Sequence, residues 1–128
     1  MRMPRILIVE DHATMRDAMR LVLEETGASV EEAADGQAAL DAIRREPPDL
    51  VFLDLNIPGL GGPEVLSEIR RDEVTASIPV IVVTAQGEEG RASAMRMGAV
   101  GYLTKPFGPR ALAQAVEQAL GGSGRRGS

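Results

Sequence analysis

The sequence predicts a single α/β domain: a doubly wound sheet of five parallel strands with five helices packed on its two faces. Two observations support this fold class. Short apolar segments alternate with helix-like segments five times along the 128 residues, an order that is typical of a parallel sheet. Three of the short segments are continuously apolar, as expected for strands buried on both faces. Right-handed crossovers between such strands place helices on both sides of the sheet.

The predicted strands are five short runs, three of which are rich in Val, Ile and Leu. The runs are residues 5–10, 28–33, 50–53, 78–83 and 100–103. The second run is half polar, which indicates a strand at an edge of the sheet. Pro79 lies near the start of the fourth run, where a missing backbone N–H is tolerated.

The segments between and after these runs carry helix patterns. In the first helix, apolar residues recur at intervals of three and four, at Met15, Ala18, Met19, Val22 and Leu23. The starts of the second, third and fifth helices are marked by Asp35, Pro63 and Pro109. Gly27 and Gly98 end the first and fourth helices. The fourth helix, residues 88–97, is predicted to be weak because Gly87 and Gly90 lie in its first turns.

Composition argues against several classes of function. With 19 acidic and 14 basic residues the net charge is −5, which disfavours direct binding to nucleic acid. The absence of cysteine excludes disulfides and thiolate sites. No apolar run is long enough for a membrane span or a signal peptide, so we expect a cytoplasmic protein without membrane insertion. Residues 1–120 form the predicted domain, and residues 121–128 (GGSGRRGS) are predicted to be a flexible tail or linker.

Polar residues stand where the apolar runs stop. They are Glu10 and Asp11 after the first strand, Asp54 after the third, Thr84 after the fourth and Lys105 after the fifth. Because the carboxyl ends of parallel strands share one edge of the sheet, and ligands of doubly wound sheets bind there, we expect these side chains to converge. Lys105 is the only lysine among 14 basic residues, which favours a site that needs an ammonium group.

The charges of this group indicate a metal site. Three carboxylates and one lysine sum to −2, and the carboxylates would repel one another unless one took up a proton. A divalent cation with a preference for oxygen removes that repulsion, which predicts Mg²⁺, with Mn²⁺ as an alternative. A metal, a lysine and a hydroxyl around one carboxylate are the groups that phosphoryl transfer needs, and that carboxylate can be the nucleophile.

Four segments together resemble the receiver domain of response regulators in two-component signalling, the class that includes the bacterial chemotaxis regulator. They are LIVEDHATMR, LVFLDLNIPGLGG, VIVVTA and GAVGYLTKPF, in order and at matching intervals. The resemblance extends over about residues 5–120. It implies a flavodoxin-like receiver fold with five helices and the strand order 2-1-3-4-5.

The resemblance also implies roles for single residues. Asp54 matches the phosphoacceptor, and Lys105 matches the lysine that contacts the phosphoryl oxygens. Asp11 matches the direct metal ligand, Glu10 matches the second acid, and Asn56 matches the position whose backbone carbonyl completes the metal site together with Asp54.

Further matches concern switching and dephosphorylation. Thr84 and Tyr102 match the switch hydroxyl and the switch aromatic. The Lys105–Pro106 bond matches a cis peptide. Asn56 and Gln86 match positions that tune attack by water on the phosphoryl group.

The implied function is signalling rather than enzymatic turnover, with a domain that catalyses its own aspartyl phosphorylation and dephosphorylation. The implied phosphoryl donor is a sensor histidine kinase or a histidine phosphotransfer protein. The implied recipient of the signal is a downstream effector protein or an output domain. A homodimer through the face of the fourth helix, fifth strand and fifth helix is also compatible with the sequence.

Two other functions are open to the sequence. A phosphatase with an aspartate nucleophile usually has a second acid two residues later, where this chain has Asn56. A scaffold that works without phosphorylation would leave the set of acids, lysine and hydroxyl without a role.

Other single features of the sequence have simpler interpretations. The glycines of residues 59–62 lack the spacing of a dinucleotide-binding loop. His12 directly follows two acids, which would suit a metal ligand, but a lone histidine at the start of a helix more often faces solvent, and we expect this of His12. The methionines expected to fill the core are Met15, Met19, Met95 and Met97.

Overall fold

A computed structural model of the chain, which describes residues 3–121, contains one five-stranded sheet. The strands are β1 (Arg5–Val9), β2 (Ser29–Ala33), β3 (Leu50–Asp54), β4 (Val80–Thr84) and β5 (Gly101–Thr104). Every neighbouring pair is parallel, and the order is β2-β1-β3-β4-β5. The predicted fold class and strand order are confirmed. The half-polar strand β2 lies at an edge, as its sequence predicts.

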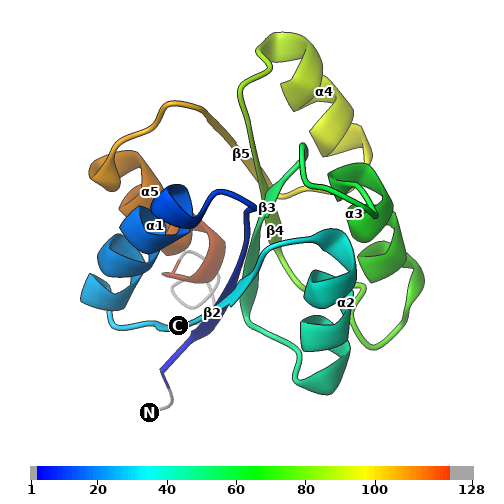
Figure 1. Cartoon of the computed structure of the whole chain (residues 1–128), viewed down its shortest axis with the longest axis horizontal. Coiled ribbons are helices and arrows are strands. Elements are labelled where there is room, and N and C mark those ends of the chain that lie inside the picture. The colour runs from blue at the N-terminus through cyan, green and yellow to red at the C-terminus, as the bar shows by residue number, and fades with distance from the viewer. Residues whose placement is uncertain (1–2, 122–128) are drawn as a thin grey trace.

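Helices cover both faces of the sheet (Figure 1). The helices are α1 (Ala13–Glu25), α2 (Gly36–Arg45), α3 (Gly62–Arg71), α4 (Glu88–Arg96) and α5 (Pro109–Val116). Helices α1 and α5 pack together on one face, while α2, α3 and α4 lie on the other. A short π-helical turn, η1 (Glu117–Gly121), follows α5.

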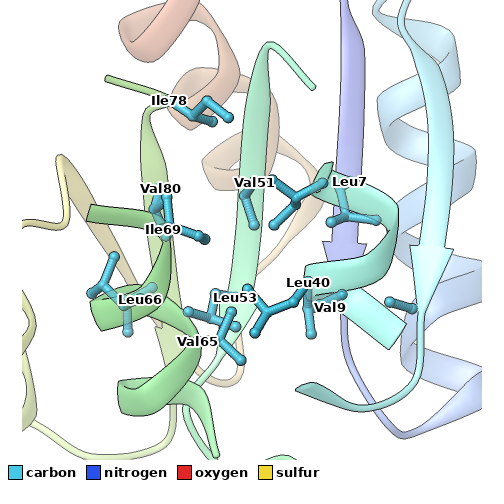
Figure 2. Packing of buried hydrophobic residues seen from close by; sticks show 14 of the residues in the cluster. Leu7, Val9, Leu40, Val51, Leu53, Val65, Leu66, Ile69, Ile78 and Val80 are labelled. Atoms are coloured by element: carbon cyan, nitrogen blue, oxygen red, sulfur yellow. The ribbon is translucent and has the colours of Figure 1, made fainter. Parts of the chain in front are cut away.

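Alternation along the buried strands produces two hydrophobic cores, one on each face of the sheet. In β1, Leu7 and Val9 point towards α2 and α3, whereas Ile6 and Ile8 point towards α1 and α5. Figure 2 shows the first of these cores, where side chains from two helices meet those of the central strands. Strands β3 and β4 are buried along their whole length, which explains their uninterrupted apolar sequences.

The predicted helix boundaries have the expected local causes. The carboxylate of Asp35 caps α2 by accepting a hydrogen bond of 2.8 Å from the backbone N–H of Ala38. Gly27 and Gly98 have φ values of 95° and 102°, which L-residues rarely adopt, and each follows the end of a helix. Pro109 is the first residue of α5, where no N–H is needed.

Several details differ from the predictions. Ala18 belongs to the apolar pattern of α1 but is exposed, because the helix fully buries only Met19 and Leu23 of that pattern. Met95 is 42% exposed, since it lies on the outer side of α4, and Val100 is 53% exposed and precedes the regular part of β5. The α-helical part of α5 ends at Val116, and the chain continues in the π-helical turn η1.

Gly121, the first residue of the predicted tail, is instead the last residue of η1. Residues 122–128 of that tail lie outside the described residues. Within residues 3–121, no helix combines the length and the apolar character that crossing a bilayer would need.

Candidate functional site

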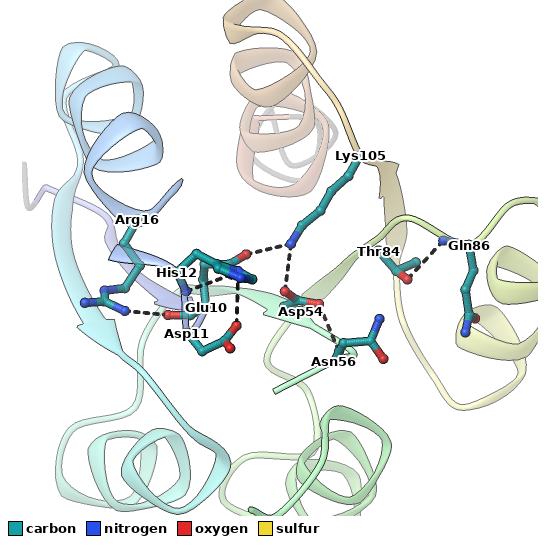
Figure 3. A network of polar contacts seen from close by, with 9 residues as sticks. All are labelled: Glu10, Asp11, His12, Arg16, Asp54, Asn56, Thr84, Gln86 and Lys105. Atoms are coloured by element: carbon teal, nitrogen blue, oxygen red, sulfur yellow. Dashed lines mark hydrogen bonds and ion pairs between the residues drawn. The ribbon is translucent and has the colours of Figure 1, made fainter. Parts of the chain in front are cut away.

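The carboxyl ends of the strands bring the predicted polar side chains to one edge of the sheet (Figure 3). Glu10 directly follows β1, Asp54 is the last residue of β3, and Lys105 directly follows β5. The ammonium Nζ of Lys105 donates to Glu10 Oε1 at 2.9 Å and to Asp54 Oδ2 at 2.8 Å. Residues that are 95 and 51 positions from the lysine in sequence therefore meet at one cation.

Burial makes the electrostatics of this cluster strong. The side chains of Glu10 and Asp54 are only 2% and 3% exposed. Burial raises the pKa of Asp54 above its ordinary value, with the nearby charge of Glu10 acting in the same direction. Burial also acts to raise the pKa of Glu10, but hydrogen bonds from Lys105 and from the backbone of His12 outweigh it and lower this pKa to about 2.

The same contacts hold the lysine in its charged form. Burial alone would lower the pKa of Lys105, but its bonds to Asp54 and Glu10 raise it above the ordinary value. The cluster thus contains a firmly charged ammonium between two buried carboxyl groups.

Both carboxylate oxygens of Asp54 have a fixed partner. The backbone N–H of Asn56 donates to Oδ1 at 2.9 Å, while Lys105 holds Oδ2. These two bonds orient the side chain of Asp54 at the end of a central strand. Asn56 follows in the next loop and is exposed to solvent.

The neighbouring Asp11 gives a direct test of whether a divalent cation suits this site. Its Oδ1 atom is buried yet accepts no hydrogen bond from any described residue. Donor atoms of Glu10, Asp11 and His12 all lie within 4.8 Å of one another. The two acids do not cap α1, because its N-cap is His12. An oxygen-rich group with an unsatisfied buried acceptor fits a divalent cation.

Thr84 and Tyr102 lie on the other side of Asp54. Thr84 is 1% exposed, and its hydroxyl oxygen accepts from the backbone N–H of Gln86 at 3.2 Å. The Tyr102 hydroxyl donates to the carbonyl oxygens of Gln86 and Gly87. Among the described residues no hydrogen bond joins Thr84 to Asp54.

The peptide bond between Lys105 and Pro106 is cis.

Sequence reasoning missed two participants in this network. His12 is 73% exposed, as expected, but its Nδ1 lies 3.0 Å from Glu10 Oε2. Arg16 donates to the backbone carbonyl of Glu10 at 2.8 Å and supports the end of β1 from α1. The position of His12 directly after two acids is the one sequence feature that could have indicated its contact.

Comparison with known proteins identifies the family. A family model described as the response regulator receiver domain matches residues 6–117. The chain therefore belongs to the response regulator receiver domain family, which makes it a signalling domain of two-component systems.

Two curated relatives are regulators of transcription. The phosphate regulon transcriptional regulatory protein PhoB of Escherichia coli is 38% identical over 117 residues, which cover 91% of this chain and 51% of that protein. The alkaline phosphatase synthesis transcriptional regulatory protein SphR of Synechococcus elongatus is 42% identical over 118 residues, covering 84% and 45%. The chain spans about half the length of these relatives.

Two solved structures share the fold over almost their whole length. The chemotaxis response regulator CheY4 of Vibrio cholerae has a TM-score of 0.88 at 29% identity, covering 93% of this chain and 100% of that one. The receiver domain of sensor histidine kinase PA1611 of Pseudomonas aeruginosa has a TM-score of 0.86 at 29% identity, covering 94% and 99%. That structure holds a magnesium ion coordinated in its active site cleft.

Proposed function

We propose that the chain is a phosphorylation-activated receiver of a two-component phosphorelay, with Asp54 as the phosphoacceptor. The observation that best supports this is the fixed Asp54 carboxylate, bonded on Oδ1 by the backbone of Asn56 and on Oδ2 by Lys105. A buried carboxylate oriented beside a cation is suited to act as a nucleophile.

The proposed donor is a phosphohistidine of a sensor histidine kinase or a histidine phosphotransfer protein. An oxygen of Asp54 attacks the phosphorus, so that a P–O bond forms while the P–N bond to the donor imidazole breaks. The electron pair of that bond returns to the imidazole nitrogen, which takes up a proton. Lys105 offers its ammonium to the negatively charged phosphoryl oxygens.

The acidic residues around Asp54 provide the proposed metal ligands. Glu10, Asp11, Asp54 and the backbone carbonyl of Asn56 would hold Mg²⁺, or Mn²⁺ in its place. When bound, the cation neutralises negative charge on the carboxylates and on the phosphoryl group. The Oδ1 atom of Asp11 supports this assignment, because it is buried and accepts no hydrogen bond from a described residue, with His12 Nδ1 3.4 Å away.

Thr84 and Tyr102 are the proposed switch residues. Asp54 pairs with Val83 in the sheet, so the next residue, Thr84, is close enough to turn towards a phosphoryl group on Asp54. Tyr102 contacts the loop that follows Thr84 and is expected to move inwards with it. The face of α4, β5 and α5 then changes, and an effector protein, an output domain or a second copy of the chain binds it.

The transcriptional regulators among the relatives support an output in gene regulation. The expectation of no direct contact with nucleic acid concerns this chain alone, since the relatives are about twice as long. We place the reaction in the cytoplasm.

The proposal is tested by intact-mass measurement after incubation with acetyl phosphate, with and without Mg²⁺. One phosphoryl adduct is expected only when Mg²⁺ is present, and Asp54→Asn, the matched control, should carry none. A folded wild-type protein that forms no adduct, and whose amide spectrum is unchanged by beryllofluoride, would instead be a scaffold that works without phosphorylation. Turnover of a generic phosphomonoester would identify a phosphatase.

The decay of the adduct tests the proposed roles of Asn56 and Gln86. Both residues are exposed, Asn56 two positions after the phosphoacceptor and Gln86 two positions after Thr84, and we assign to their side chains an influence on the approach of water. Replacing both by arginine is expected to change the lifetime of the adduct by about tenfold, which corresponds to ~1.4 kcal/mol in the barrier. An unchanged lifetime would show that these residues do not tune hydrolysis.

A further inference from the structure

Arg16 lies in the first turn of α1, but its side chain reaches back to the end of β1. Its Nη1 donates to the backbone carbonyl oxygen of Glu10 at 2.8 Å, and its Nε donates to Glu32 Oε1 at 2.9 Å. The side chains of Arg16 and Glu32 are 19% and 23% exposed. Figure 3 shows the guanidinium group directed at this end of β1. One planar group therefore joins α1, the edge strand β2 and the residue that follows β1.

The backbone of Glu10 is held on both of its sides. Its N–H donates to the carbonyl oxygen of Ala33 in β2 at 3.0 Å, while its carbonyl oxygen accepts from Arg16. The carbonyl of Glu10 and the N–H of Asp11 belong to one planar peptide unit, so the direction of the first fixes the direction of the second. Arg16 consequently orients the peptide that joins the two acids, and with it the point at which the Asp11 side chain leaves the backbone.

The position of Arg16 in α1 does not favour the helix itself. The start of a helix carries partial positive charge, which opposes a cationic side chain there. The first turn of α1 contains no acidic residue that would offset this repulsion. The hydrogen bonds of Arg16 to Glu32 and to the Glu10 carbonyl account for a cation at this position, whereas helix stability does not.

We propose that Arg16 is a positioning residue for the metal site, and that it acts by orienting the peptide between Glu10 and Asp11 without touching the ion. The inference rests on the proposed function, because Glu10 and Asp11 are the proposed magnesium ligands. Residues that support metal ligands from behind commonly contribute about tenfold to a hundredfold to metal affinity.

The sign of the effect separates positioning from charge. Arg16 is a cation near the acids, so neutralising it would strengthen the binding of Mg²⁺ if charge alone mattered. Loss of orientation has the opposite result, because the two carboxylates no longer approach the ion in the same geometry. Weaker binding by a variant that lacks this positive charge is therefore specific to positioning.

The first measurement is the dissociation constant of Mg²⁺, determined by calorimetry for wild type, Arg16→Gln and Arg20→Gln. Arg20 is the matched control, because it carries the same charge on the same helix while its bonds go to Glu32 and Glu24. The dissociation constant is expected to rise about tenfold in Arg16→Gln and to stay within about twofold of wild type in Arg20→Gln. Binding by Arg16→Gln as tight as that of wild type, or tighter, would overturn the proposal, as would equal weakening in both variants.

The second measurement needs no metal. The ¹³C resonance of the Glu10 carbonyl carbon reports the hydrogen bond that its oxygen accepts. In metal-free buffer this resonance and the amide resonance of Asp11 are expected to shift in Arg16→Gln and to stay close to wild type in Arg20→Gln. Unshifted resonances in folded Arg16→Gln would show that the guanidinium group does not orient this peptide.

A third variant covers the case in which Arg16→Gln does not fold. Arg16→Lys retains the positive charge but lacks the planar fork of donors that bonds Glu32 and Glu10 together. Its dissociation constant for Mg²⁺ is expected to rise severalfold, and wild-type affinity would overturn the proposal. Urea denaturation of each variant in metal-free buffer measures stability separately. A merely structural role of Arg16 would lower stability and leave the Mg²⁺ affinity of the folded variant unchanged.

Failure of this inference is distinguishable from failure of the proposed function. If the chain forms the Mg²⁺-dependent adduct on Asp54 and Arg16→Gln binds Mg²⁺ as wild type does, only the role of Arg16 is wrong. If no adduct forms while Arg16→Gln weakens the binding of Mg²⁺, the role of Arg16 stands and the proposed phosphorylation fails. A wild-type chain that binds no Mg²⁺ would overturn both proposals.

Discussion

At the scale of single residues, the site depends on the ammonium group of Lys105, which pairs with two buried acids. Lys105 contacts both Glu10 and Asp54, and neither carboxyl group is accessible enough for water to replace the ammonium. Removing one partner of a buried ion pair leaves the other charge uncompensated, which costs far more than losing a surface pair.

We predict that Lys105→Met lowers the free energy of unfolding by about 3 kcal/mol in metal-free buffer near neutral pH. Urea denaturation followed by circular dichroism measures this change. Lys105→Arg keeps the positive charge and is expected to lose clearly less. If Lys105→Met were within about 0.5 kcal/mol of wild type, the range of an ordinary surface substitution, the lysine would not stabilise the two acids.

At the scale of elements, α4 shows why a glycine can be required inside a helix. Gly87 is the N-cap of α4, so only Gly90 lies within it. Gly90 is buried, and a Cβ atom there would lie 2.7 Å from Cβ of Gln86 and 3.1 Å from the hydroxyl of Tyr102. The glycine thus leaves room for the tyrosine, which its sequence context does not reveal.

We therefore predict that Gly90→Ala destabilises the chain by about 1 kcal/mol, although helix propensity alone would predict a gain of similar size. The displaced Tyr102 is the only tyrosine and there is no tryptophan, so intrinsic tyrosine fluorescence reports the change directly. Gly87→Ala is the matched control, because a Cβ there meets nothing within 4 Å. A more stable Gly90→Ala variant with unchanged fluorescence would contradict the argument.

The edge strand β2 is held by ion pairs on both of its faces. Alternation places Glu31 and Glu32 on opposite sides, where Glu31 pairs with Arg5 and Arg45, and Glu32 bonds Arg16 and Arg20 of α1. Charged side chains also protect an exposed edge from pairing with other strands. The hydrogen bond from Arg20 is the main reason that the pKa of Glu32 lies below its ordinary value of 4.5.

We predict that Glu32→Gln lowers the free energy of unfolding by about 1 kcal/mol at neutral pH. A lowered folded-state pKa means that ionised Glu32 stabilises the fold above the unfolded pKa, and that this contribution is lost as pH falls through the folded value. Urea titrations at several pH values should therefore show the variant and wild type converging in acid. Glu25→Gln, at an exposed position of α1, controls for the change in net charge. A difference that persists in acid would rule out the ionic origin.

At the scale of the whole molecule, the sequence predicts the architecture well because the two sides of the sheet impose it. Uninterrupted apolar strands such as β3 and β4 must be covered by helices on both faces of the sheet. Helix ends are set by local features of the sequence, such as the capping carboxylate of Asp35 and the positive φ of Gly27. The convergence of Glu10, Asp54 and Lys105 follows from strand direction alone. The contact of His12 with Glu10 and the packing of Gly90 against Tyr102 do not, because they depend on side-chain positions that no periodicity encodes.

The last prediction concerns the coupling of the acidic site to global stability. A cation that binds only the folded chain stabilises it by an amount that grows with concentration, about 2.7 kcal/mol at 100 times its dissociation constant. We predict that Mg²⁺ raises the urea midpoint of wild type, with potassium chloride at equal ionic strength as the control. Asp11→Asn should lose most of this gain without being less stable in metal-free buffer, since the Asp11 oxygen accepts no hydrogen bond among the described residues. An equal gain in wild type and Asp11→Asn would place the stabilising ion elsewhere on the chain.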